Sequence, residues 1–416
     1  MHPFAKGWRV GSGIWLLLLF LTGCASPGRR SEQPGYPPDW TAADVLLNVP
    51  FLAAEPDNPY PAMLSMLNAY WTDDTGRRWL RRAAVDWGRD VTGADADWEA
   101  ALREVGLWAY WGEGRLATLA ERLDQAIPVW LFVQSSPWSR RDLRPVLVIG
   151  RDLAGKRWWM YEPTGPAIWS TAQLERQWSN AGWRWVVIVP PQAAEWDLTP
   201  AQHRSRGRYW MALHDYERAA DDFEAALVAA SDEAIYYVEL ADSHLHRGQY
   251  TLAEPLYRAA LTLDDLQARA MNNLAYTLTQ QGLAAQLAAR EDVTNADDRL
   301  ATAQVLLDEA VEWARRATVL QPDNPRLLNT LGQALHYQGK HRQAVPVLQR
   351  ARARAMQDDA LTQAQIALNL VEVYHTLGQR HLARQTLADA LQHNPALHVP
   401  RHLHVHLRQE YRVPRR

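Results

Sequence analysis

The second half of the chain repeats a helix–turn–helix pattern, and this repeat constrains the fold more than any other feature. Gly248 and Gly282 lie 34 residues apart, and Gly339 and Gly378 occupy the matching place in later units. We therefore predict that all four are turn residues between paired helices. Because one unit of this length cannot bury its apolar face alone, neighbouring units must stack. The pattern predicts an all-α array over residues 200–398.

Five units share the same phase of small and large side chains. In the fourth unit, Gly332 is small where two helices must approach, and Leu348 fills the space between pairs. The interval after Gly282 is longer than the period, which indicates an insertion near residues 283–305. This insertion can form an extended helix pair or a loop, and a tolerated surface insertion without function is the simpler interpretation.

This pattern resembles the tetratricopeptide repeat, an all-α superhelix in which the first helix of each unit lines a concave groove. The resemblance implies which positions of the first helix point into the groove. In the third and fourth units these positions carry Arg269, Asn272, Tyr276, Thr279, Gln280, Arg326, Asn329, Gln333, His336 and Tyr337. Amides can hydrogen-bond an extended peptide, and tyrosines supply contact area. Protein or peptide partners are therefore expected, with a merely solvated surface as the alternative.

The N-terminus carries a targeting segment. Two basic residues precede the apolar run 14–21, which is too short to cross a bilayer as a helix. The run leads into Leu-Thr-Gly-Cys, which ends at Cys24 and resembles the bacterial lipoprotein box. The resemblance implies a signal peptide over residues 1–23 and acyl chains on Cys24. Because Ala25 follows, it also implies an outer-membrane anchor facing the periplasm. An ordinary secretory signal that contains a cysteine is the alternative.

Residues 24–39 are polar and rich in proline and glycine, so they are expected to form a tether. In residues 40–195, helical patterns come first, at residues 60–71, 79–90, 98–104 and 116–125. Apolar runs typical of strands follow, at residues 129–133, 146–149, 158–161 and 185–189. Helices followed by strands favour an α+β domain with an antiparallel sheet.

A series of short motifs in residues 40–195 points to one family. Residues 49–64 begin with Val-Pro-Phe and end with Pro-Ala-Met-Leu. Later segments follow in a matching order, at residues 105–110, 127–129, 144–150, 161–163, 174–178 and 186–190. The series resembles the bacteriocin-processing (double-glycine leader) peptidase-like family of cysteine peptidases. The resemblance implies a papain-like α+β fold.

The catalytic residues of that family are absent from this chain. Carried over residue by residue, the oxyanion-hole glutamine falls on Ala54 and the nucleophilic cysteine on Pro59. The general-base histidine falls on Arg144 and the orienting aspartate on Glu162. Proline offers no nucleophile, and arginine stays protonated. Because residues 25–202 contain no cysteine or histidine, we expect a pseudo-peptidase without enzymatic activity.

Two other functions stay open for this region. A carboxylate pair of Glu162 with Asp57 or Glu55, near Ser135 and Ser136, would suit a replacement hydrolase. Fifteen of the 20 tryptophans of the chain also lie between residues 40 and 195, and most of them are expected in the core. A few could instead line a cleft that binds peptidoglycan or another glycan, namely Trp108, Trp111, Trp138 and Trp158.

The composition of the chain excludes further classes of function and of binding site. The formal net charge of −3 gives no basic excess for nucleic acid. The single cysteine excludes a disulfide framework and a cysteine-based zinc site. His402, His404 and His406 have no carboxylate or cysteine beside them, so residues 399–416 are expected to form a basic, solvated tail that holds no metal. No cofactor is expected.

The sequence thus predicts a papain-like α+β domain followed by a tetratricopeptide-repeat superhelix in an envelope lipoprotein. Its expected role is that of an adaptor or scaffold that binds proteins or peptides. An active cysteine peptidase or other hydrolase and a glycan-binding lipoprotein are the alternatives.

Overall fold

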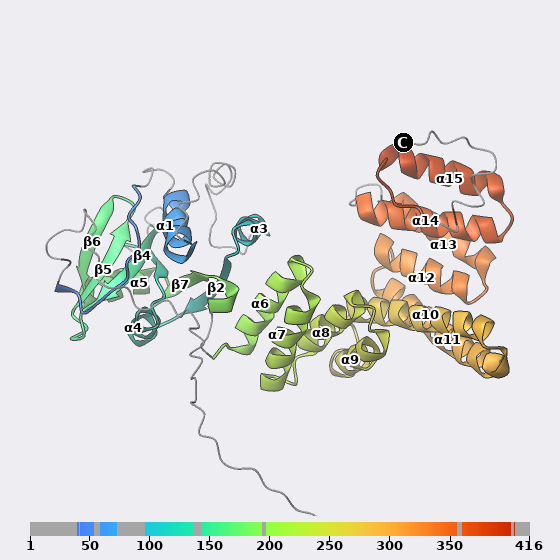
Figure 1. Cartoon of the computed structure of the whole chain (residues 1–416), viewed down its shortest axis with the longest axis horizontal. Coiled ribbons are helices and arrows are strands. Elements are labelled where there is room, and N and C mark those ends of the chain that lie inside the picture. The colour runs from blue at the N-terminus through green and yellow to red at the C-terminus, as the bar shows by residue number, and fades with distance from the viewer. Residues whose placement is uncertain are drawn as a thin grey trace, which may run out of the picture. The chain divides into compact units, whose positions relative to one another are not determined.

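The chain divides into two compact units, Met1–Ala194 and Glu195–Arg416 (Figure 1). The structure, a computed structural model, describes residues 40, 42–53, 59–72, 96–135, 143–193, 197–355, 360–400 and 403. The predicted signal peptide, Cys24, the tether and Ala54 lie outside these residues, as do His402, His404 and His406. No helix in the described ranges combines the length and apolar character that a membrane crossing needs.

The first unit is built on one antiparallel sheet with the strand order β2-β7-β3-β4-β5-β6, and β1 pairs with β4. The strands are Val45–Leu46 (β1), Trp108–Glu113 (β2), Val129–Val133 (β3), Arg144–Arg151 (β4), Arg157–Glu162 (β5), Gly165–Ser170 (β6) and Arg184–Val189 (β7). All five residues of β3 are buried, so this central strand is covered on both faces. The four predicted strands correspond to β3, β4, β5 and β7.

Besides the two-residue strand β1, the sequence pattern misses two strands that lie at the ends of the strand order. Strand β2 and strand β6 have only part of their side chains buried, and β6 begins with Gly165 and Pro166. Edge strands lack the continuous apolar run of a central strand. Among the described residues of this unit, the helices are Tyr60–Thr72 (α1), Ala96–Glu104 (α3), Leu116–Asp124 (α4) and Thr171–Asn180 (α5), with a 3-10 turn at Pro191–Ala193. The helix predicted at residues 79–90 lies outside the described residues.

The second unit is all-helical, and its described part holds five helix pairs. They are α6 and α7 (Pro200–Ala212, Tyr216–Ala229), α8 and α9 (Ala234–His246, Tyr250–Leu263), α10 and α11 (Ala268–Glu291, Ala296–Leu320), α12 and α13 (Pro325–Tyr337, His341–Arg354), and α14 and α15 (Ala360–Thr376, Arg380–His393). Consecutive helices pack together, and α10 also packs on α12, as α12 does on α14. The first helices of neighbouring pairs therefore form a common face.

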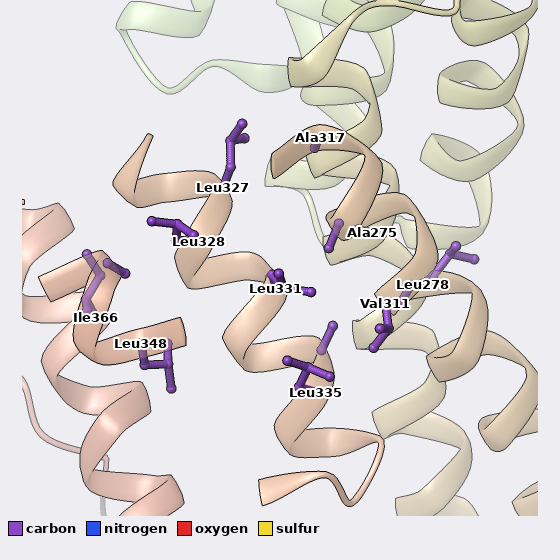
Figure 2. Close-up of a cluster of buried hydrophobic side chains, with 14 of the residues drawn as sticks. Ala275, Leu278, Val311, Ala317, Leu327, Leu328, Leu331, Leu335, Leu348 and Ile366 are labelled. Carbon is purple, nitrogen blue, oxygen red and sulfur yellow. The ribbon is translucent and has the colours of Figure 1, made fainter. Parts of the chain in front are cut away.

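The predicted alternation of small and large residues sets the spacing within pairs. A Cβ atom on Gly207 would lie 2.5 Å from Phe223, and one on Gly332 would lie 2.4 Å from Leu348. These distances are too short for any side chain, so glycine permits the close approach of the two helices. Between pairs, Leu328 of α12 points toward Ile366, while Leu331 lies on the side of α10 and α11 (Figure 2).

Gly282 is not a turn residue, so the prediction made from the repeat spacing is wrong at this position. Gly248, Gly339 and Gly378 have φ values of +71°, +88° and +70° and follow the ends of their helices. Gly282 instead lies inside α10, where a Cβ atom would meet Leu307 of α11 at 2.8 Å. The residues after it are mostly good helix formers, so the helix continues to Glu291. Residues 283–305 therefore belong mainly to a long pair of helices whose turn lies at residues 292–295, with a 3-10 turn at Val293–Asn295.

The C-terminal end of the array is capped by the segment that follows α15. Val399 and Leu403 are each 4% exposed and belong to the same apolar cluster as the repeats. The prediction of a solvated tail beginning at residue 399 is therefore wrong for these two residues. The reason is that the last pair of a repeat array has no following pair to cover its apolar side.

Candidate functional site

The predicted groove residues lie on the first helices α10 and α12, and several of them bond to neighbouring helices. On the α14 side, Asn369 donates a hydrogen bond to Asn329 at 2.8 Å. The Tyr337 hydroxyl donates to Glu372 of α14, with oxygen–oxygen distances of 3.2 and 3.3 Å. Burial, followed by the charge of Glu372, raises the pKa of Tyr337. We call the surface formed by α8, α10, α12 and α14 the first-helix face.

Asp242 joins three helices beside this face. It is 4% exposed and accepts hydrogen bonds from Tyr257 of α9 at 2.5 Å and from Asn273 of α10 at 2.8 Å. Arg269 of α10 also bonds to the carboxylate of Asp242. Burial, and then the charge of Asp242, raises the pKa of Tyr257. The guanidinium of Arg269 is thus already paired, although its side chain is 55% exposed.

Two side chains on the first-helix face keep free hydrogen-bonding groups. Asn272 donates its amide to Asn273 at 3.0 Å, but its own carbonyl oxygen is buried and has no partner. Gln333 is half-buried, and its amide bonds to nothing within the described part of the chain. The buried carbonyl oxygen of Asn272 is costly to leave unpaired, whereas the half-buried amide of Gln333 can be hydrated. These groups are the ones that a ligand backbone would satisfy.

Other predicted groove residues are packed inside the array. Thr279 is fully buried and donates its hydroxyl to the Ala275 carbonyl at 2.7 Å. His336 is 7% exposed, with its Nδ1 atom 3.0 Å from Nδ1 of His341 and its Nε2 atom 4.0 Å from Glu372. Burial, helped by His341, lowers the pKa of His336 to about 4. The prediction that Thr279 and His336 face a ligand is therefore wrong, because packing between the helices covers both side chains.

In the first unit, the positions that match the peptidase motif make structural contacts. Pro59 is buried, and its carbonyl accepts the amide of Met63 at 3.2 Å at the start of α1. Arg144 donates to Gln177 at 3.1 Å and to Ser135 at 3.4 Å. The guanidinium carbon of Arg144 lies 5.8 Å from the ring of Trp169.

Glu162 also contacts Trp169. Its carboxylate accepts a hydrogen bond from the indole of Trp169 at 2.6 Å. Arg144 and Glu162 therefore lie at the same indole ring, where Glu162 accepts its N–H and Arg144 lies over its face. The remaining members of the proposed carboxylate site, Asp57, Glu55 and Ser136, lie outside the described residues.

Two of the four tryptophans considered for a cleft are in the core. Trp108 is 3% exposed and Trp158 is 2% exposed, so neither can stack on a sugar. The prediction that most tryptophans lie in the core is confirmed for these two, and the alternative that they line a cleft is excluded, because their large rings fill the interior of the sheet domain. Trp111 is half-buried and stacks on Phe132 at 5.4 Å, and Trp138 lies outside the described residues.

Sequence reasoning missed the buried acidic residues of the array. Glu239 accepts two bonds from Arg204, at 2.9 and 3.0 Å, and Asp222 bonds to Arg206 and His203, both at 2.8 Å. These residues could have been found in the sequence as acidic residues within the apolar stripe of a helix. An acidic residue buried in this way needs a paired partner. The described residues contain no group of histidine, cysteine and carboxylate side chains that could hold a metal ion.

Family comparison defines the class of the helical unit. Residues 205–268 and 247–289 match the tetratricopeptide repeat family. The chain therefore contains tetratricopeptide repeats, as its periodicity predicts. No curated protein matches the chain.

Solved structures similar to this chain include other tetratricopeptide-repeat proteins. One is a thermophilic protein of Thermus thermophilus, with 20% identity and a TM-score of 0.38, matching 50% of this chain and 96% of that one. YrrB, a repeat protein with an unusual peptide-binding site, has 16% identity and a TM-score of 0.34, with 50% and 90% covered. MamA of Desulfovibrio magneticus RS-1 has 10% identity and a TM-score of 0.37, with 47% and 96% covered.

Proposed function

We propose that this protein is a non-enzymatic scaffold that binds extended segments of other proteins on its first-helix face. The observation that carries the proposal is that the carbonyl oxygen of Asn272 on α10 and the amide of Gln333 on α12 have no partner within the described residues. The family match supports it, since repeat arrays present extended surfaces suited to binding. Tyr276 and Tyr337 flank these amides and supply rigid contact area.

An extended peptide backbone is the ligand that this face suits best. Each amide side chain can donate and accept a hydrogen bond, as a peptide group can. The bonds from Asn369 to Asn329 and from Tyr337 to Glu372 hold neighbouring side chains in place before a ligand arrives. A surface ordered in advance loses less conformational entropy on binding.

Replacing Asn272 and Gln333 together by alanine is expected to weaken partner capture about tenfold, or about 1.4 kcal/mol. The fold should be unaffected, because neither side chain bonds to another helix within the described residues. The measurement is quantitative mass spectrometry of proteins cross-linked to the chain in the native envelope. The matched control replaces two exposed glutamines on second helices, Gln343 and Gln385, by alanine. Equal capture by both variants would contradict the proposal.

The first unit is proposed to be a papain-like domain that has lost its chemistry. In support, the nucleophile position is occupied by buried Pro59, which offers no nucleophilic side chain. The base position is Arg144, which is bound to Gln177 and Ser135. Glu162 is likewise engaged, by Trp169. Such a domain would hold or position a partner without cleaving it.

The scaffold is proposed to be anchored in the bacterial envelope, at the outer membrane facing the periplasm, through acyl chains on Cys24. We expect the Cys24→Ser variant to lose its membrane attachment, because each buried methylene contributes about 0.8 kcal/mol to anchoring. Fractionation of cells, followed by detection of the chain in membrane and soluble fractions, measures this. A variant that stays with the membrane as the wild type does would rule out the lipid anchor.

A further inference from the structure

In the first two repeats, the end of the second helix and the loop that follows it expose aliphatic and acidic side chains. Val228 is 83% exposed and Leu266 is 68% exposed. The exposed acidic residues of the same loops are Asp232, Glu233, Asp264 and Asp265. We call these six residues the acidic rim.

These residues lie along one edge of the array. Each is at the end of a second helix or just before the next first helix. Because helices alternate in direction and successive pairs pack side by side, all such loops lie at the same edge. The turns within pairs, including the turn between α10 and α11, lie at the opposite edge.

The carboxylates of the acidic rim carry no counter-charge. Within the described residues, no arginine, lysine or histidine pairs with any of the four, and the bond they make is from the Leu266 amide to Asp264 at 3.1 Å. Asp323, in a later loop of the same kind, is held instead by Arg350 at 3.0 Å and Arg354 at 3.1 Å. The acidic rim therefore combines apolar area with unpaired negative charge.

The end of this chain has the complementary chemistry. Residues 404–416 contain four arginines and one glutamate, interspersed with Val405, Leu407, Tyr411 and Val413. This segment follows directly on Leu403, which is buried in the repeat core. A cationic segment with apolar side chains can neutralise the rim carboxylates and cover Val228 and Leu266 at once.

We propose that residues 404–416 of one copy dock on the acidic rim of a second copy. Fully extended, 13 residues span at most about 43–47 Å. Within one copy the first helices α8, α10, α12 and α14 pack one after another at interaxial distances of about 8–10 Å, so reaching back from Leu403 to the rim would use more than half of this length. A second copy removes that constraint. The contact is a head-to-tail one, independent of the first-helix face.

The test is sedimentation velocity of the soluble Cys24→Ser chain over a range of concentrations. We expect the parent chain to self-associate. A rim variant, Asp264→Lys with Asp265→Lys, and a tail variant, Arg412→Glu with Arg415→Glu and Arg416→Glu, should each weaken association at least tenfold. Mixing the two variants should restore it, because the reversed charges then attract. Asp264 and Asp265 are exposed, and circular dichroism checks that each variant folds.

A matched control separates a specific contact from net charge. Asp297→Lys with Asp298→Lys makes the same charge change on exposed residues at the opposite edge and should leave association intact. Three outcomes would each overturn the proposal. The parent chain could stay monomeric, the control variant could associate as weakly as the rim variant, or the mixture of the two charge-reversed variants could fail to associate. The two proposals can be told apart: partner capture tests binding at the first-helix face, whereas self-association tests the contact between the tail and the acidic rim.

Discussion

Replacing Asp242 by alanine is expected to lower the stability of the repeat array by about 1–3 kcal/mol, since the substitution leaves the buried hydroxyl of Tyr257 without an acceptor. The hydroxyl of Tyr257, the amide of Asn273 and the guanidinium of Arg269 would all lose their acceptor. Buried donors without a partner carry the full cost of their lost hydration. The effect should appear in α8, α9 and α10 together.

Hydrogen exchange of the amides of α8, α9 and α10, measured in the whole chain, reports this change without requiring the two units to unfold together. Asp265→Ala is the control, because Asp265 is exposed and unpaired within the described residues; its effect should stay within about 0.5 kcal/mol. A loss of protection no larger than in this control would show that Asp242 does not hold the three helices together.

Acid is expected to destabilise the array through His336. Its pKa is lowered from the ordinary 6.5 to about 4 by burial and by His341, while Glu372 and Tyr337 also face the ring. The unfolded chain therefore binds a proton below pH 6.5, whereas the folded chain stays neutral down to about pH 4. The stability that His336 provides is complete above pH 6.5 and is lost as the pH falls from 6.5 to 4. The loss amounts to about 2 kcal/mol at about pH 5 and roughly 3 kcal/mol at full extent.

Urea unfolding at about pH 7 and about pH 5, followed by hydrogen exchange of α12 and α14, measures this loss. His336→Gln removes the titrating ring while keeping a polar side chain, so most of the pH dependence in this range should disappear. His341→Gln is the comparison variant, because it removes the neighbouring imidazole ring and leaves His336 in place, so the pH dependence should persist. An unchanged pH dependence in the His336→Gln variant would place the acid sensitivity elsewhere.

The elements with strong local patterns were predictable. Central strands such as β3 are continuous apolar runs because both of their faces are buried, whereas the edge strands β2 and β6 lack such runs and were missed. The role of Gly332 followed from the small residue required where two helices touch. Residues 269–276 and 329–337 were placed on first helices by their phase in the repeat, and the helices lie there.

What a side chain contacts across helices was decided only by the tertiary structure. The position of Gly282 in the repeat indicated a turn, yet the helix formers after it and Leu307 of the facing helix keep it helical. His336 and Thr279 occupy ligand-facing positions by phase but are covered by neighbouring side chains. Asp242 bonds to residues up to 31 positions away, which no local pattern specifies. The sequence by itself determined the period, the paired helices and the antiparallel sheet, because these follow from spacing along the chain. Burial and pairing depend on neighbours distant in sequence, so only the packed structure settled which polar groups are free to bind a partner.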